Sequence, residues 1–215
     1  QVDWVSGKDL RTAFDKSEVE VNSWVDAERT LLSDPCPASG SARETTVLAQ
    51  SSITVDAGLN DCGFPGLTVE VMKPGKLLWT FDEVLTNGEV DAARMNCCNA
   101  IEWIFARPGR YRVEAFEPYV WRYANLFTPD GEMTVSDLHV RTYKNPSVGR
   151  ATFRSSDPAL EKVFAAAKET FAQNAVDVFT DCPSRERAGW LCDSFFIGRV
   201  SRLLTGNADL ERLFL

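Results

Sequence analysis

The stretch SDPALEKVFAAAKETFAQNA, residues 156–175, marks the point at which the chain changes from one kind of secondary structure to another. Ser156 or Asp157 can cap a helix, and Pro158 is suited to the first helical position. The apolar residues that follow recur with a helical period and form one stripe, which comprises Leu160, Val163, Phe164, Ala167, Phe171 and Ala175. The stretch therefore predicts an amphipathic helix.

Two further helical patterns follow this stretch. Pro183 interrupts the region, and the second pattern extends over residues 190–204. Its apolar face includes Phe196, Val200, Leu203 and Leu204. The pair at 206–207, Gly-Asn, ends that pattern, and residues 208–215 begin a third helix. So few helices cannot close a ring of paired helices, so we expect a fragment of a larger parent or a chain that pairs with another. A small domain with a docked C-terminal helix is the alternative.

The chain before residue 150 shows the alternation of apolar and polar residues that is typical of strands. The alternation extends over residues 45–143, and it is broken by turn-forming Gly, Pro, Asn and Asp at 73–75, 87–88, 107–109 and 129–131. Short strands at this spacing, without helical inserts, predict an antiparallel β-sandwich. The fold class is therefore expected to be mixed, with a sheet unit followed by a helical unit.

The N-terminal region has a third kind of pattern. Residues 8–32 resemble a helix in their apolar spacing, and residues 34–41 are rich in Pro, Ser and Gly and predict a loop. We therefore divide the chain into a helical and loop segment at 1–44, a β-sandwich at 45–150 and a helical unit at 151–215.

Charge and composition exclude several classes of protein. The chain has 215 residues and a formal net charge of −8, which argues against nucleic acid or an anionic membrane surface as a partner. No apolar stretch approaches the length of about 20 residues that a transmembrane helix requires. The six cysteines include no CxxC pair, and His139 is the only histidine, so we expect neither a zinc site nor a catalytic triad. No cofactor is implied, and most cysteines are expected to be reduced.

The run DCPSRERAGWLCD, residues 181–193, concentrates the chemistry of the chain. It contains three carboxylates, two guanidinium groups and an indole, together with the turn-forming Pro183 and Gly189. Carboxylates can protonate a leaving oxygen or hold hydroxyl groups, and an indole can cover the apolar face of a sugar. The run therefore favours a sugar site. A salt-bridged loop packed on a core tryptophan is the alternative.

Together with residues 157–164 and Asn174, this run resembles the bacterial α-L-rhamnosidase family of glycoside hydrolases. The matching features are the spacing of the acids, the Cys-Pro pair, both arginines and the Gly-Trp pair. Upstream, the sequence EPYVWRY at 117–123 resembles the strand with aromatic residues in the β-sandwich that precedes the family's barrel. The resemblance extends over about residues 67–215. It implies an antiparallel β-sandwich followed by the first helices of an incomplete (α/α)6 barrel.

The resemblance also assigns roles to residues of the run. Glu186 corresponds to the family's general acid, which must be protonated at the working pH. Asp181 and Asp193 correspond to carboxylates that hydrogen bond the hydroxyls of a rhamnoside substrate, and Arg185 and Trp190 correspond to positions that line the same pocket. Many family members have an extra Asp between the residues equivalent to Arg185 and Glu186, which leaves the partner of Arg185 open.

The family inverts configuration, and its general base is a second carboxylate that lies late in the barrel, beyond Leu215. An inverting pair stands about 6.5–9.5 Å apart with a water molecule between the two carboxyl groups. We therefore expect a parent enzyme that hydrolyses α-L-rhamnosides or a related sugar, and a fragment that hydrolyses nothing alone. The alternative function is a non-catalytic carbohydrate-binding or scaffold module, for which the alternating aromatics Tyr119, Trp121 and Tyr123 form either a sugar platform or part of the core.

Overall fold

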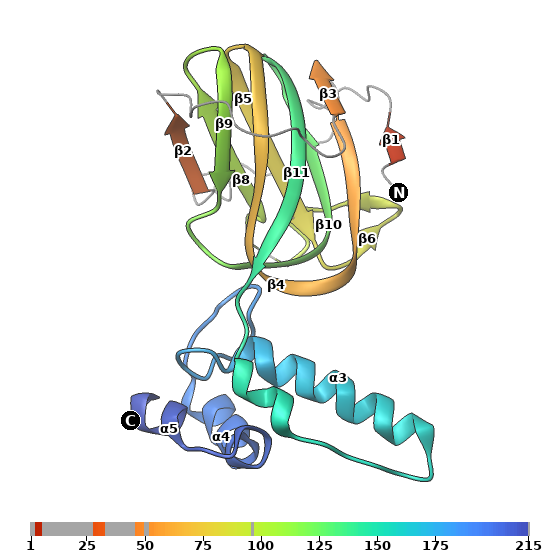
Figure 1. Cartoon of the computed structure of the whole chain (residues 1–215), viewed down its shortest axis with the longest axis vertical. Coiled ribbons are helices and arrows are strands. Elements are labelled where there is room, and N and C mark those ends of the chain that lie inside the picture. The colour runs from red at the N-terminus through yellow and green to blue at the C-terminus, as the bar shows by residue number, and fades with distance from the viewer. Residues whose placement is uncertain (1–2, 6–27, 33–45, 50–51, 96, 215) are drawn as a thin grey trace. The chain divides into compact units, whose positions relative to one another are not determined.

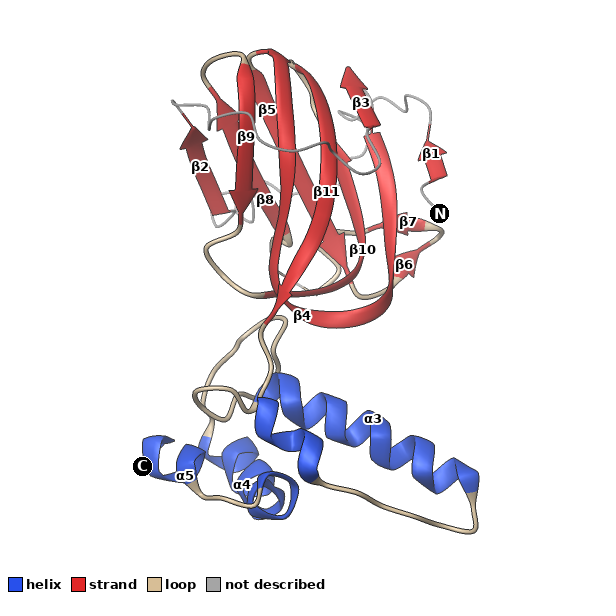
Figure 2. Cartoon of the chain, viewed as in Figure 1, coloured by secondary structure: helices blue, strands red, loops and turns tan. Residues whose placement is uncertain are grey.

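The computed structural model describes residues 3–5, 28–32, 46–49, 52–95 and 97–214, which form the elements labelled in Figure 1. The chain divides into two compact units, Gln1–Arg141 and Thr142–Leu215. Strands make up the first unit and helices the second, as the colouring of Figure 2 shows. None of the helices in the described ranges has the length and hydropathy that a membrane span needs. The mixed fold class is confirmed.

The first unit is built from a nine-stranded sheet whose hydrogen-bonded order is β2-β8-β5-β10-β4-β11-β3, with β1 and β9 also paired to β4. A separate hairpin pairs β6 with β7. The strands are β1 (Asp3–Val5), β2 (Glu28–Leu32), β3 (Thr46–Ala49), β4 (Ser52–Lys73), β5 (Gly75–Asp82), β6 (Leu85–Thr86), β7 (Glu89–Val90), β8 (Ala100–Phe105), β9 (Gly109–Glu114), β10 (Tyr119–Phe127) and β11 (Glu132–Thr142).

The long strand β4 connects two layers of this sheet. Its first part pairs with β10 from Ser52 to Gly63, and its second part pairs with β9 from Gly66 to Val71. Because one strand takes part in both sets of hydrogen bonds, the sheet curls over on itself, and β4 follows that curve in Figure 1. The expected β-sandwich is therefore formed, and each layer presents one face to a shared core.

The core of the sandwich consists of buried apolar residues from its strands. Trp79 lies at its centre, with ring centroids 6.1 Å from Trp103 and 5.3 Å from Trp121, both in edge-to-face geometry that favours aromatic pairs. The core also contains Ile53, Leu67, Val69, Val71, Leu77, Phe81, Ile101, Phe105, Tyr111, Val113, Leu126, Met133 and Val135. The predicted turns occur between strands as well, and at 87–88 both residues have the positive φ of a tight hairpin.

The helix predicted over residues 8–32 is wrong for residues 28–32, which form strand β2. This strand pairs in parallel with β8 from Glu28 opposite Ile101 to Leu32 opposite Phe105. The carbonyl of Leu32 also accepts a hydrogen bond of 3.0 Å from the amide of Ala106. These partners lie far away in the sequence, so a local apolar period cannot reveal them. Residues 8–27 and the loop predicted at 34–41 lie outside the described residues.

The second unit contains the helices α3 (Pro158–Asn174), α4 (Leu191–Thr205) and α5 (Asp209–Phe214), and the 3-10 helix η2 (Pro146–Arg150). Asp157 caps α3 by accepting a 2.9 Å hydrogen bond from the amide of Ala159, and Pro158 occupies the first turn, as predicted. Gly206 ends α4 in the left-handed conformation with φ of 77°. The first two helical patterns are therefore confirmed with their caps.

The apolar stripes of these helices are only partly covered. The core of the second unit is formed by Val148, Phe171, Ala172, Ala175, Phe179 and Leu210. Thus the C-terminal half of the stripe on α3 is buried, whereas Leu160 and Val163 are exposed. On α4 the predicted apolar face is exposed at Phe196, Val200 and Leu203, and the buried positions are Ser194, Ser201 and Thr205. The pattern predicted the helix correctly, but the apolar face of α4 does not form the core of this unit.

Candidate functional site

The run that concentrates the chemistry forms the connection between α3 and α4, and we call residues 181–190 the acid loop. The chain leaves α3 at Asn174 and enters the acid loop after Thr180. The amide of Thr180 donates to the carbonyl of Asn174 over 2.9 Å, and the Thr180 hydroxyl lies 3.2 Å from the same carbonyl. The side chain of Asn174 is buried, and its Nδ2 donates to the carbonyl of Thr170 over 2.9 Å. Asn174 therefore fixes the direction in which the chain enters the loop.

Asp181 closes the base of the acid loop through its own backbone and side chain. Its amide donates to the carbonyl of Ala188 over 3.0 Å, and its Oδ1 accepts from the amide of Ala188 over 2.9 Å. Its Oδ2 accepts from the thiol of Cys182 over 3.2 Å. Burial opposes the charge of Asp181 and is the largest single influence, but the hydrogen bonds from Ala188 and Cys182 together hold its pKa below the usual range.

The end of the loop is held by packing. A Cβ added at Gly189 would lie 2.8 Å from the ring of Phe214, which is closer than side chains tolerate. Phe214 in turn packs against Phe179, with ring centroids 5.7 Å apart. Gly189, which the sequence indicates as turn-forming, therefore lies where the backbone closely approaches Phe214. The carbonyl of Trp190 then accepts from the amide of Ser194 over 2.9 Å, which starts α4.

Glu186 contacts two of the other predicted site residues. Its Oε2 accepts a 2.9 Å hydrogen bond from the indole Nε1 of Trp190, and its Oε1 pairs with the guanidinium of Arg185. The side chain of Glu186 is 39% exposed, and Trp190 is 56% exposed. The partner of Arg185 that the sequence leaves open is therefore Glu186 itself. Carboxylate, guanidinium and indole meet on one open surface of the loop.

The remaining predicted residues lie apart from this cluster. Asp193 is exposed in the first turn of α4, where the helix N-terminus favours a negative charge. Asp181 is half-buried and directed at the backbone of Ala188. The structure thus brings together Arg185, Glu186 and Trp190, and it leaves Asp193 facing solvent.

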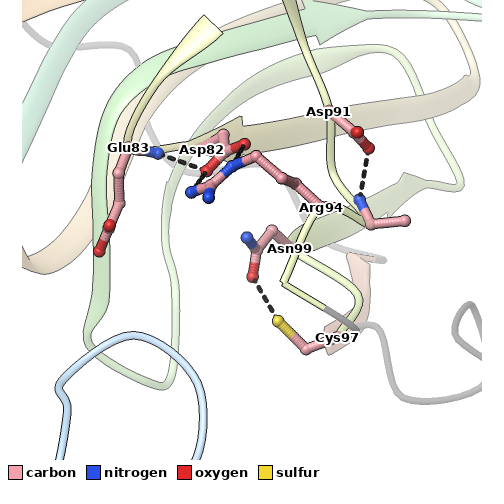
Figure 3. Close-up of polar contacts among 7 residues, drawn as sticks. Asp82, Glu83, Asp91, Arg94, Cys97 and Asn99 are labelled. Atoms are coloured by element: carbon pink, nitrogen blue, oxygen red, sulfur yellow. Dashed lines mark hydrogen bonds and ion pairs between the residues drawn. The ribbon is translucent and has the colours of Figure 1, made fainter. Parts of the chain in front are cut away.

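Sequence reasoning missed a buried ion pair in the sheet unit, shown in Figure 3. Asp82 is fully buried, and it accepts 2.7 Å and 2.6 Å hydrogen bonds from Nε and Nη2 of Arg94. The hydrogen bond with Asp82 is the main reason that the pKa of Arg94 is raised. In the sequence, Asp82 is one of several acids near predicted turns. Its position at the end of a strongly apolar strand was the one available signal that it would be buried.

The aromatic strand does not form a sugar platform. Trp121 is only 3% exposed and belongs to the core beside Trp79. Tyr119 packs on Phe81 with ring centroids 5.0 Å apart, and the guanidinium of Arg122 lies 4.8 Å from the ring centroid of Tyr123. These alternating aromatics therefore serve the packing of the sandwich.

Five of the six cysteines lie in the described residues. The cysteines at positions 62, 97, 98, 182 and 192 are present as thiols, and Cys36 lies outside the described residues. In the ranges that the structure describes, no cluster of His, Cys, Asp and Glu side chains is arranged to hold a metal ion. The side-chain chemistry of the acid loop is therefore that of acids, arginines and an indole.

Comparison with solved structures defines the class of fold. The chain is similar to a GH78 family rhamnosidase of Bacillus sp. GL1, with a TM-score of 0.68 and 23% identity over 75% of this chain and 17% of that one. A Klebsiella oxytoca rhamnosidase with rhamnose bound gives a TM-score of 0.66 and 20% identity over 77% and 35% of the two chains. The native α-L-rhamnosidase of Aspergillus terreus gives a TM-score of 0.58 and 22% identity over 80% and 20%. The fold is therefore that of rhamnosidases, of whose length the chain spans only a part.

The family comparison identifies the helical unit more closely. Residues 149–213 match the family described as the bacterial alpha-L-rhamnosidase 6 hairpin glycosidase domain. This segment includes the whole acid loop. No curated protein matches the sequence.

Proposed function

We propose that this chain is part of a glycoside hydrolase that cleaves terminal α-L-rhamnosides, or a related sugar, by inverting acid/base hydrolysis. The observation that carries the proposal is the contact of Glu186 with both Arg185 and Trp190 inside the segment that matches the rhamnosidase domain. The two contacts orient the carboxyl group of Glu186, and its side chain, which is 39% exposed, is accessible to a substrate.

Each side chain of the cluster has a role in this proposal. Glu186 donates its proton to the glycosidic oxygen as the bond to the sugar breaks. Arg185 and Trp190 set the direction of the Glu186 carboxyl group through the contacts described above. The exposed ring of Trp190 offers an apolar surface to the sugar, and Asp193 and Asp181 hydrogen bond its hydroxyl groups.

The general base is supplied from outside the chain. An inverting enzyme needs a second carboxyl group about 6.5–9.5 Å from the acid, on the far side of the sugar, to activate water. In the solved rhamnosidases this chain covers only 17% to 35% of the length, so the greater part of such an enzyme lies elsewhere. We therefore expect the base, and the remaining walls of the pocket, to come from the rest of a larger parent.

The test is the Glu186→Gln variant of the full-length parent, assayed on two α-L-rhamnosides with different leaving groups. Loss of a general acid lowers the rate about 10²–10⁴-fold, and we expect the larger loss with methyl α-L-rhamnoside because methoxide cannot leave without a proton. The loss with 4-nitrophenyl α-L-rhamnoside is smaller, since nitrophenolate is a stable anion. Glu70→Gln, an exposed glutamate on β4, is the matched control.

Two outcomes would contradict the proposal. Equal losses on both substrates would remove Glu186 from the role of proton donor, and unchanged turnover would remove it from the site. The stereochemistry of the first-formed rhamnose, followed by proton NMR, tests inversion separately, because retention of configuration would require a covalent intermediate. A panel of other aryl glycosides tests whether rhamnose is the preferred sugar.

A further inference from the structure

The contacts of Asp181 are directed at its own loop. Both side-chain oxygens of Asp181 are used inside the chain, one by the amide of Ala188 and the other by the thiol of Cys182. We propose that Asp181, in addition to the substrate contact proposed above, is a positioning residue, whose carboxylate closes the acid loop and thereby holds Glu186 against Trp190. The relevance of this role to catalysis rests on the function proposed above, whereas the closure itself can be tested without any sugar.

The geometry of the closure is a reciprocal pair of hydrogen bonds. Asp181 and Ala188 each donate a backbone amide to an oxygen of the other residue, over 3.0 Å and 2.9 Å. Six residues lie between these partners, and they include Arg185 and Glu186. Because the acceptor on Asp181 is a charged carboxylate, its bond to the Ala188 amide is stronger than a bond between neutral groups.

The backbone inside the loop needs this support. Arg187 has φ of 51°, a left-handed conformation that a residue with a Cβ rarely adopts. It lies directly between Glu186 and Ala188, so the residue with the unfavourable conformation adjoins both the proposed acid and the closure. If the Asp181 carboxylate is removed, one support of this left-handed conformation is lost, and a rotation of Arg187 to an ordinary conformation would carry Glu186 away from Trp190.

Contacts that do not involve Asp181 hold the two ends of the connection between α3 and α4. The entry is fixed by Asn174 and Thr180, and the exit is fixed by the packing of Gly189 on Phe214. Neither anchor contacts Arg185 or Glu186. The hydrogen bonds of Asp181 join the two ends of the acid loop directly.

The experiment compares three variants in the full 215-residue chain: Asp181→Ala, Asp181→Asn and the control Asp177→Ala. Asparagine keeps an oxygen that can accept from the Ala188 amide, whereas alanine keeps none. Asp177 is an exposed acid just before the loop, so its removal changes the same charge without touching the closure. Trypsin is a suitable probe because it cleaves after Arg185 and Arg187 only when their backbone can become extended.

We expect Asp181→Ala to accelerate tryptic cleavage after Arg185 and Arg187 about tenfold, the factor that corresponds to losing one hydrogen bond to a charged group. Asp181→Asn should remain within about threefold of the unchanged chain, because the hydrogen bond to the neutral amide oxygen persists. Asp177→Ala should cleave at the original rate. The indole N–H resonance of Trp190, assigned with Trp190→Phe, should shift in Asp181→Ala while the resonances of Trp79 and Trp103 stay in place.

Unchanged cleavage and an unchanged Trp190 resonance in Asp181→Ala would overturn the proposal, and so would equal effects of Asn and Ala. If Asp181→Ala does not fold, Asp181→Asn decides alone: an unmoved Trp190 resonance supports the closure, and a shifted one overturns it. None of these measurements involves hydrolysis, so their failure leaves the glycosidase proposal standing. A failed Glu186→Gln assay would likewise leave the closure intact.

Discussion

At the scale of single residues, two Asp–Arg ion pairs of the sheet unit have similar geometry but different burial. Asp82 is fully buried and paired bidentately with Arg94, whereas Asp56 makes a similar bidentate pair with Arg122 on an exposed surface. The chemistry of the two pairs is the same, but their surroundings differ. An uncompensated buried charge is costly, while an exposed one is stabilised by water.

This contrast leads to a prediction for stability. Arg94→Ala should lower the free energy of unfolding by about 3–5 kcal/mol, because it leaves the buried Asp82 carboxylate without its partner. Arg122→Ala should have a far smaller effect, since water replaces the lost contact with Asp56. Urea unfolding at neutral pH measures both. Similar losses in the two variants would mean that Asp82 is accessible to water in solution.

At the scale of secondary-structure elements, α4 buries small residues on one face and exposes three large apolar residues on the opposite face, while Ile197 and Leu204 between them pack against the core. Ser194 and Ser201 are buried, and a Cβ added at Gly198 would lie 3.6 Å from the ring of Phe179. Small residues allow the helix to approach the core of the second unit closely. On the opposite face, Phe196, Val200 and Leu203 are exposed. This apolar face is a surface on which further helices of a six-hairpin domain can pack.

The outward face of α4 gives a prediction that separates this chain from its proposed parent. Leu203 is 80% exposed, so Leu203→Glu should change the stability of the chain by at most about 0.5 kcal/mol. The same substitution in the parent should destabilise it by several kcal/mol, because a charge would then be buried against neighbouring helices. Leu210→Ala, at a buried position, should cost about 2–5 kcal/mol in both. Thermal unfolding of the four variants measures the difference, and a neutral Leu203→Glu in the parent would contradict the packing of helices on this face.

At the scale of the whole molecule, the proposed function assigns the proton donor to Glu186 in the acid loop and the general base to a part of the parent outside this chain. We therefore expect the 215-residue chain to give no hydrolysis of 4-nitrophenyl α-L-rhamnoside above the rate without protein. The full-length parent at the same concentration is the positive control. Turnover by the chain that is abolished by Glu186→Gln would show that the general base is also encoded here, and the division of the site between chain and parent would be wrong.

Local patterns were sufficient for most of the elements between residues 45 and 214. Period-two spacing predicted the inward faces of β4 and β5, and the Asp157-Pro158 pair predicted the start of α3, because caps and faces depend on near neighbours. The run at 181–193 indicated a sugar site through the types and spacing of its residues. The comparisons support its rhamnosidase origin, and the roles of its individual side chains remain proposals.

Three features were decided only by the tertiary structure. The parallel pairing of β2 with β8 replaced an expected helix, Asp82 became buried beside Arg94, and Asp181 turned toward Ala188. The physical reason is the same in each case. A sequence period shows which side chains share a face, but the free energy of that face depends on what a distant part of the chain places against it.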